Sequence, residues 1–150
     1  MPLQNLLKIG RLKAHDPNAA EVQRLLAAIK RNLADAAVTN ISDETRFDAA
    51  YKAIMQCSLV ALLASGYRPA TSEPGHQQTM IQSLALTLGV DTDVWVVLDA
   101  LRRQRNANDY TGQPISAAAV GECLSQATAL EKALLAHLRA KHTSLLTPVA

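Results

Sequence analysis

Aromatic residues are scarce in this chain of 150 residues, at 3% of the total, although 49% of its residues are hydrophobic. Alanine and leucine supply most of the apolar residues, whereas a sheet sandwich would need more valine, isoleucine, tyrosine and phenylalanine. The composition therefore favours close-packed helices over a sheet. The length predicts one domain spanning residues 1–150, because a second independent core would need a longer chain.

Cysteine is also rare, and the charges nearly balance. The two cysteines, Cys57 and Cys123, lie far apart in the sequence, which fits neither a metal motif nor a disulfide framework. We therefore expect a reduced, cytoplasmic protein. The formal net charge of +2 is too small for nucleic-acid binding through bulk electrostatics, so any site for a polyanion must be local.

Long apolar runs and the common catalytic motifs are absent from the sequence. The longest purely apolar run, residues 59–64, is too short to cross a bilayer, and the N-terminus lacks the apolar segment of a signal peptide. No Gly-rich phosphate loop, HExxH or GxSxG motif occurs. The histidines are scattered: His15, His76, His137 and His142. The sequence thus predicts no membrane span, no metal and no cofactor.

Hydrophobic periodicity predicts a series of helices separated by short breaks. A first short helix is expected over residues 3–14, with its leucines facing inward. Asp16 and Pro17 form a typical helix start, and the second helix should run to about residue 38. Ser42 should cap the third helix, which Gly66 ends.

The second half of the chain follows the same pattern. Prolines make residues 67–74 an irregular loop, and a fourth helix is expected from Pro74-Gly75-His76 to residue 89. A fifth helix follows from Asp91 or Asp93, and Ser116 should cap a last long helix to about residue 142.

No segment has the pattern of a strand, and the tail, residues 143–150, is expected to be disordered. The sequence therefore predicts an all-α fold, an up-down helical bundle of four longer helices plus short extra helices.

The best candidate for a functional site lies where the fifth helix ends. Val94, Leu98 and Leu101 fall on one face of that helix, and the next residue on the same face is Arg105, with Asn108 close beside it. A charge that replaces a core residue needs a partner or a ligand. We therefore interpret Arg105 as a candidate phosphate-binding residue.

Two further arginines, Arg102 and Arg103, come just before Arg105. Together the three side chains can meet phosphate groups with a bidentate geometry that lysine lacks. A simpler alternative is that Arg102 and Arg103 are solvated and stabilise the C-terminal end of their helix dipole.

Arg105 also has simpler alternatives. One is an intrahelical ion pair with Asp109, but exposed pairs contribute only about 0.3–0.5 kcal/mol, and this order of charges is the weaker one. Another is an ion pair with a buried carboxylate such as Asp48 or Asp99. The intrahelical pair leaves the position of Arg105 on the apolar face unexplained.

Arg105 is followed directly by Asn106, and Tyr110 lies five residues after Arg105. This arrangement resembles HEPN domains (higher eukaryotes and prokaryotes nucleotide-binding), helical bundles whose signature is Arg, a spacer of four to six residues, then His, often with Asn after the Arg. Tyr110 stands where the histidine is expected. Residues 66–68 and 74–76 also resemble a branch of this family.

The resemblance implies a homodimer in which the Arg motifs of both subunits meet in a cleft. Many such proteins are metal-independent ribonucleases of toxin-antitoxin or phage-defence systems, and others are non-catalytic partners of nucleotidyltransferases. In the ribonucleases the RNA 2′-OH attacks the neighbouring phosphate while Arg stabilises the developing charge. The residues to which catalysis is thereby assigned are Arg105, Asn106 and Tyr110. The residues expected to contact RNA or a nucleotide are Arg102, Arg103, Asn108, Asp109 and His76.

Tyrosine in place of histidine changes the chemistry that is expected. Histidine exchanges protons near neutral pH, whereas an unperturbed tyrosine has a pKa of about 10 and is a poor base at pH 7. Tyr110 could still donate a hydrogen bond to phosphate or stack on a base, and Asp109 and His76 are the alternative bases. A different hypothesis is a non-catalytic, dimeric helical interaction module in which Arg105 anchors a subunit contact.

Overall fold

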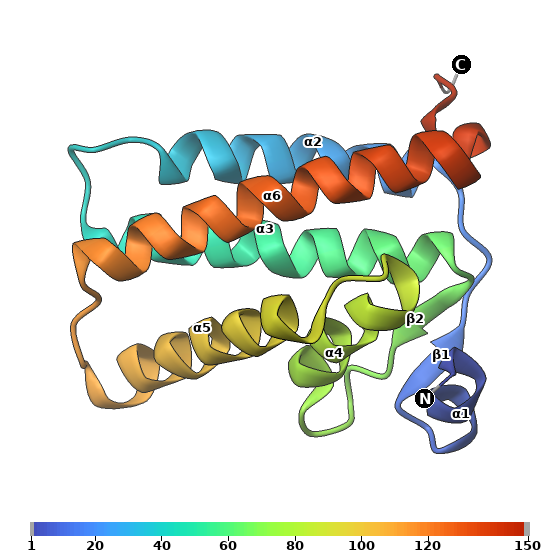
Figure 1. Ribbon diagram of the computed structural model, residues 1–150, viewed down its shortest axis with the longest axis horizontal. Coiled ribbons are helices and arrows are strands. Elements are labelled where there is room, and N and C mark those ends of the chain that lie inside the picture. Colours follow the sequence, from blue (N-terminus) through green and yellow to red (C-terminus); the bar gives the residue numbers. More distant parts are fainter. Residues whose placement is uncertain (1, 149–150) are drawn as a thin grey trace.

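The computed structural model describes residues 2–148, and four long helices dominate it (Figure 1). These are α2 (Ala19–Ala36), α3 (Asp43–Ala64), α5 (Thr92–Thr111) and α6 (Ala117–Lys141). The short elements are α1 (Leu3–Lys8), β1 (Leu12–Ala14), β2 (Tyr67–Pro69), α4 (His76–Thr87) and the 3-10 helix η1 (Thr143–Leu146). The predicted all-α bundle of four longer helices with short additions is confirmed.

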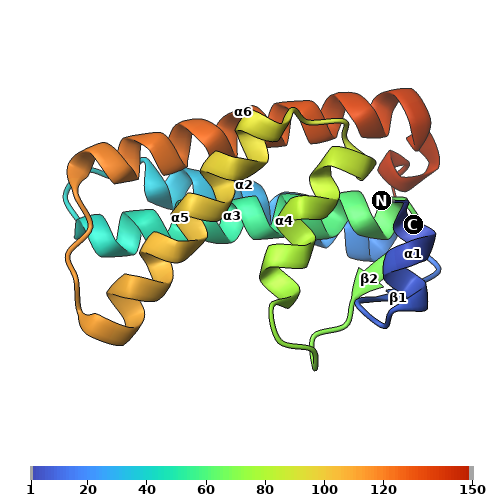
Figure 2. The same ribbon diagram turned by 60° about the horizontal axis from the view of Figure 1, so that its bottom comes forward.

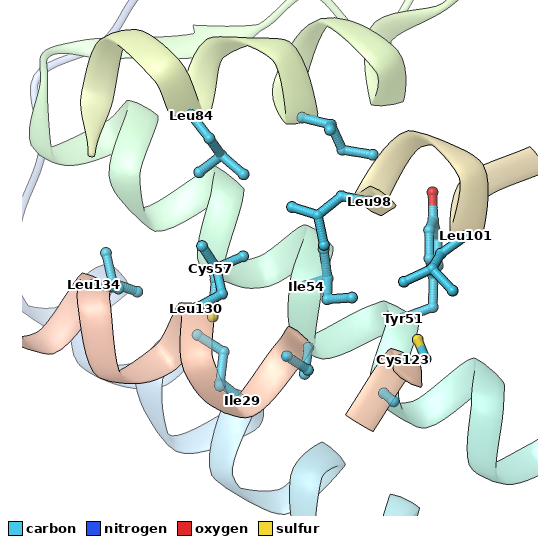
Figure 3. Close-up of a cluster of buried hydrophobic side chains, with 14 of the residues drawn as sticks. Ile29, Tyr51, Ile54, Cys57, Leu84, Leu98, Leu101, Cys123, Leu130 and Leu134 are labelled. Atoms are coloured by element: carbon cyan, nitrogen blue, oxygen red, sulfur yellow. The ribbon is translucent and has the colours of Figure 1, made fainter. Parts of the chain in front are cut away.

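The central element is α3, which packs against α2, α4, α5 and α6. Its side chains Tyr51, Ile54 and Cys57 lie among leucines from the surrounding helices (Figure 3). Its second half, in which most residues are buried, is accordingly apolar on nearly all sides. Among the described helices α3 alone has the length and hydropathy of a membrane span, and 67% of that apolar window is buried inside the fold.

The two cysteines belong to this core. Cys57 on α3 and Cys123 on α6 are both buried and free. Burial raises the pKa of each thiol to about 12, so both remain protonated and pack as small apolar side chains.

Most helix ends follow the sequence, but the start of α2 does not. Ser42 and Ser116 cap α3 and α6 as expected, and each side chain accepts a hydrogen bond from a backbone N–H of its helix. The cap of α2 is Asn18 rather than Asp16. Asn18 and Glu21 form a reciprocal capping box, which satisfies two backbone N–H groups and therefore places the start at Asn18.

The prediction of one helix over residues 3–14 and of no strand is wrong. After α1 the chain turns at Gly10, whose φ of +79° is favourable for glycine. β1 then pairs antiparallel with β2, with Leu12 opposite Pro69, so residues 67–69 are a strand rather than an irregular loop. Leu12 becomes buried while Leu7 stays exposed, because the strand and not the helix reaches the core.

The tail was expected to be disordered, and for residues 143–148 this is wrong. η1 follows α6 directly, and Leu145 is buried in the main core. Gln23 of α2 donates hydrogen bonds from its amide to the carbonyls of Leu145 and Thr147, at 3.1 and 2.6 Å. Residues 149–150 lie outside the described residues.

The position of α5 determines where the candidate residues lie. Figure 2 shows α5 running obliquely beside α4 and across α3. Its first half buries Leu98 and Leu101 against α3 (Figure 3). Its second half lies beside the N-terminal end of α4 and ends at Gly112, whose φ is +70°.

Candidate functional site

Arg105 continues the apolar face of α5 but does not enter the core. One turn beyond Leu101, its guanidinium lies over the ring of Tyr51, 5.1 Å from the ring centroid. The side chain of Arg105 is 32% exposed. The face of α5 therefore changes from buried leucine to a half-buried cation that rests on an aromatic ring.

Arg105 has two carboxylate neighbours and donates no hydrogen bond to any described residue. Its Nε lies 3.7 Å from Asp48 Oδ1, and its Nη1 lies 3.8 Å from Asp109 Oδ2. Both distances exceed those of hydrogen bonds. Arg105 thus lies near Asp109, as the intrahelical alternative predicts, and near Asp48, as the second alternative predicts. The side chain of Asp48 is 52% exposed, however, so it is not a buried carboxylate.

Asp99, the buried carboxylate of α5, pairs with the other two arginines. Arg102 Nε donates to Asp99 Oδ1 at 2.8 Å, and Arg103 Nη2 lies 3.5 Å from Oδ2. Asp99 therefore neutralises much of the positive charge of Arg102 and Arg103. Arg105 lies near two other carboxylates, Asp48 and Asp109. Arg103 is largely exposed.

A hollow of about 240 Å³ lies between the start of α4 and the second half of α5, and we call it the anion hollow. Six of the eight candidate residues line it: His76, Arg102, Arg105, Asn106, Asp109 and Tyr110. The other lining residues are Gly75, Gln77 and Gln78. The fold thus brings His76 beside a motif from which it is separated by an entire helix and loop.

Arg103 and Asn108 are the two candidates that do not line the anion hollow. Asn108 donates a hydrogen bond from its side-chain amide to the Gln113 carbonyl at 2.7 Å, across the end of α5. Its role in the structure is to hold the turn after the helix. Its spacing in the sequence predicts a position beside Arg105, but its side chain instead bonds to the backbone carbonyl of Gln113 just after the helix.

The residues at the start of α4 line the anion hollow and carry backbone N–H groups that no side chain caps. The first helical hydrogen bond runs from Thr79 N–H to the Gly75 carbonyl, and no side chain caps the helix. The N–H groups of the first turn therefore lack intrahelical partners. They belong to His76, Gln77 and Gln78, all of which line the hollow.

Tyr51 and Gln77 are parts of this site that the sequence did not indicate. The Tyr51 hydroxyl donates a hydrogen bond to Gln77 Oε1 at 2.7 Å. Burial raises the pKa of Tyr51 to about 12, although Arg105 and Arg102 act in the opposite direction. The ring of Tyr51 is buried in the core, and the only signal in the sequence for a further role is a hydroxyl on an apolar face.

Arg105 and Gln77 also line a second hollow, of about 470 Å³, which contains Asp48, Tyr51 and Lys52. Partial burial raises the pKa of Asp48, and the Arg105 charge lowers it. The carboxylates of Asp109 and Glu44 raise it further. Arg105 therefore lies near two carboxylates, those of Asp48 and Asp109, in a hollow that Lys52 also lines.

No protein-family model, curated protein or solved structure matches this chain. The HEPN resemblance therefore depends on the spacing of Arg105, Asn106 and Tyr110, on residues 66–68 and 74–76, and on the helical architecture. Within residues 2–148, no group of three or more His, Cys, Asp or Glu side chains is arranged to hold a metal ion.

Proposed function

We propose that the anion hollow binds a phosphate group of RNA and that the chain is a HEPN-like ribonuclease that needs no metal ion. The observation that carries the proposal is Arg105: a half-buried guanidinium that donates no hydrogen bond to a described residue, in one hollow with His76 and Asn106. Arginine offers five N–H donors in a planar fork that matches phosphate.

The start of α4 supplies the second reason to expect an anion. The residues of its first turn line the same hollow, no side chain caps their N–H groups, and the helix dipole adds partial positive charge at that end. Asn106 adds an amide donor. Together with Arg105 and Arg102, these groups offset the negative charge of Asp109, which also lines the hollow.

The same residues suit cleavage through the RNA 2′-OH. His76 takes the proton as the 2′ oxygen attacks phosphorus, which forms a 2′,3′-cyclic phosphate as the bond to the 5′ oxygen breaks. The leaving oxygen then takes up a proton from water or from the Tyr110 hydroxyl. Arg105 and the N–H groups of α4 stabilise the charge that develops on the phosphoryl oxygens. His76 thus replaces, from another helix, the histidine that the motif lacks.

Incubation of the purified chain with labelled RNA in EDTA tests the proposal. We expect wild-type protein to cut RNA and Arg105→Ala and His76→Ala to lose at least about 100-fold in rate, as is typical for removal of such groups. Arg103→Ala is the matched control, because Arg103 shares the helix and the charge but does not line the hollow. If Arg105→Ala binds RNA as tightly as the wild type does, the assignment of the anion hollow as the RNA site is contradicted.

A second candidate function is a non-catalytic, dimeric interaction module, and a groove between α5 and α6 favours it. Val96, Ala100 and Ala119 line this groove, and Val96 is an exposed large apolar side chain. An apolar groove of this kind suits a second copy of the chain or a protein partner such as an antitoxin or a nucleotidyltransferase. Under this hypothesis Val96→Glu abolishes a dimer seen by light scattering, whereas wild-type protein neither binds nor cuts RNA.

A further inference from the structure

A wider and more apolar hollow adjoins the anion hollow, because His76 and Gln77 line both. It has a volume of about 480 Å³, and Leu25, Leu59 and Met80 are among its apolar walls. We call it the apolar hollow. A ligand that binds in the anion hollow can therefore extend past His76 and Gln77 into the apolar hollow.

The two hollows share a fixed boundary. Gln77 lines the apolar hollow, the anion hollow and the hollow of about 470 Å³ that contains Asp48. The Tyr51 hydroxyl donates a hydrogen bond to its amide oxygen at 2.7 Å. The amide nitrogen of Gln77 is then directed away from Tyr51. A side chain held in this way is preorganised for contact with a ligand that spans two hollows.

Glu21 gives the apolar hollow a carboxylate with one oxygen free. The ring nitrogen Nε2 of His15 at 2.7 Å and the Asn18 N–H at 3.3 Å both approach Oε1. Oε2 accepts no hydrogen bond from a described residue. Burial acts to raise the pKa of Glu21, but the His15 and Asn18 hydrogen bonds lower it overall, so the group is a carboxylate at neutral pH.

Arg68 of β2 gives the same hollow an exposed cation. No carboxylate of the described residues lies within ion-pair distance of Arg68, in contrast to Arg102 and Arg105. Its guanidinium is therefore available to a ligand. The apolar hollow thus combines apolar walls with a carboxylate and a guanidinium, and Thr71, His76 and Gln77 add polar side chains to its lining.

These features match a nucleobase, and guanine best among the four. Thioether and leucine side chains pack well on the faces of an aromatic ring. In single-stranded RNA all base edges are accessible. Guanine carries N–H donors on its Watson–Crick edge for a carboxylate, and its O6 and N7 acceptors suit an arginine fork. Adenine has no comparable pair of acceptors, and uracil has no amino group. Cytosine has an amino group and two acceptors, but its single ring offers the apolar walls a smaller face than the double ring of guanine.

We propose that the apolar hollow binds a guanine base of the RNA strand, next to the phosphate that Arg105 holds. Glu21 accepts hydrogen bonds from the base, Arg68 donates to it, and Met80 and Leu59 contact its faces. This assignment rests on the proposed function, since the phosphate defines which base reaches the hollow. With this contact the site recognises the base sequence of the RNA as well as its phosphate backbone.

Binding of short, uncleavable RNAs to the full chain tests the assignment. The probes are five-nucleotide oligouridines with every 2′-OH methylated, in which one uridine at a time is replaced by guanine, adenine or cytosine. Fluorescence anisotropy with wild-type protein should give affinity about tenfold higher for one guanine-containing oligonucleotide, the discrimination typical of a bidentate base contact. Arg68→Gln should reduce that preference to about twofold or less.

Arg139→Gln is the control for Arg68→Gln, because Arg139 is also exposed but lies on α6 and lines none of these hollows. It should retain the guanine preference. If wild-type protein binds all the oligonucleotides equally and Arg105→Ala binds none of them, the base assignment is overturned and the phosphate site is supported. A guanine preference that persists in Arg68→Gln would also overturn it. Failure of every oligonucleotide to bind wild-type protein would overturn the proposed function itself.

Discussion

The guanidinium of Arg105 lies over the ring of Tyr51, 5.1 Å from its centroid, and the hydroxyl of the same ring holds Gln77 at 2.7 Å. One buried side chain thus orients residues from two other helices. The ring restricts the arginine without using its N–H donors, and the hydroxyl fixes the boundary between the anion hollow and the apolar hollow. Through Tyr51, α3 therefore holds two side chains of the candidate site in position.

This relationship predicts different results for two substitutions of Tyr51. Tyr51→Phe keeps the ring beneath Arg105 but removes the donor to Gln77, and should lower the free energy of unfolding by about 1 kcal/mol. Tyr51→Leu also removes the aromatic face, and should weaken RNA binding by about tenfold because Arg105 is no longer held. Urea denaturation and anisotropy measure the two effects. Equal RNA affinity of the leucine and phenylalanine variants would contradict the role of the ring.

Arg105→Lys separates the charge of Arg105 from its shape. Lysine keeps the positive charge near Asp48 and Asp109 but lacks the planar fork, so RNA affinity should fall about tenfold. It should stay above that of Arg105→Ala. Circular dichroism should show a folded protein in both variants, because the side chain is partly exposed and its ion pairs contribute only about 1 kcal/mol or less. Wild-type affinity in Arg105→Lys would indicate that charge alone is needed.

Asp48→Asn tests the acidic neighbours of Arg105 through the pH dependence of stability. Burial raises the folded-state pKa of Asp48 above its ordinary value of 3.8, so between these two values the folded state holds more protons than the unfolded state. The contribution of Asp48 to the free energy of unfolding therefore falls as pH rises through this window. At pH 7 Asp48→Asn should be more stable than wild type, by no more than about 0.5 kcal/mol because the carboxylate is half exposed.

The gain from Asp48→Asn should disappear as pH falls below 3.8, where the wild-type carboxyl is protonated in both states. Urea denaturation at several pH values measures it. Loss of one carboxylate beside Arg105 should also strengthen RNA binding at pH 7. Weaker binding together with lower stability would mean that Asp48 is needed to hold Arg105.

Tyr110→His restores the residue that the HEPN motif contains. Tyr110 is 87% exposed at the end of α5, so the change should leave the free energy of unfolding unaltered. Under the proposed function the RNA cleavage rate at pH 7 should rise by about tenfold or more, because imidazole exchanges protons near neutrality. Single-turnover cleavage of labelled RNA in EDTA measures the rate. An unchanged rate would indicate that proton donation from residue 110 to the leaving oxygen does not limit cleavage.

Leu145→Ala tests the docking of the tail on the bundle. Leu145 is buried, and two hydrogen bonds from Gln23 hold its segment. Removal of the side chain should lower the free energy of unfolding by about 2–3 kcal/mol. Ser144→Ala, at the exposed neighbouring position, is the control and should change little. A Leu145→Ala variant as stable as the control would mean that the tail is not part of the core.

The sequence by itself determined the helical class and most helix ends. Apolar residues at three- and four-residue spacing define a helix face whatever the partner, and Ser42, Ser116 and Gly112 act on backbone groups within a few residues. The same local logic identified Arg105 as a cation on an apolar face. These features depend only on neighbours in the chain.

Tertiary structure decided the contacts between segments that are far apart in the sequence, because the pattern within each segment carries no information about them. The pairing of Leu12 with Pro69 joins segments more than fifty residues apart, and β1 is too short to show a period of two. The stacking of Arg105 on Tyr51, the arrival of His76 beside the motif, and the shared role of Gln77 depend on how α3, α4 and α5 pack. Periodicity gives the face of each helix, but the rotation and offset of one helix against another follow from the side chains of both at once.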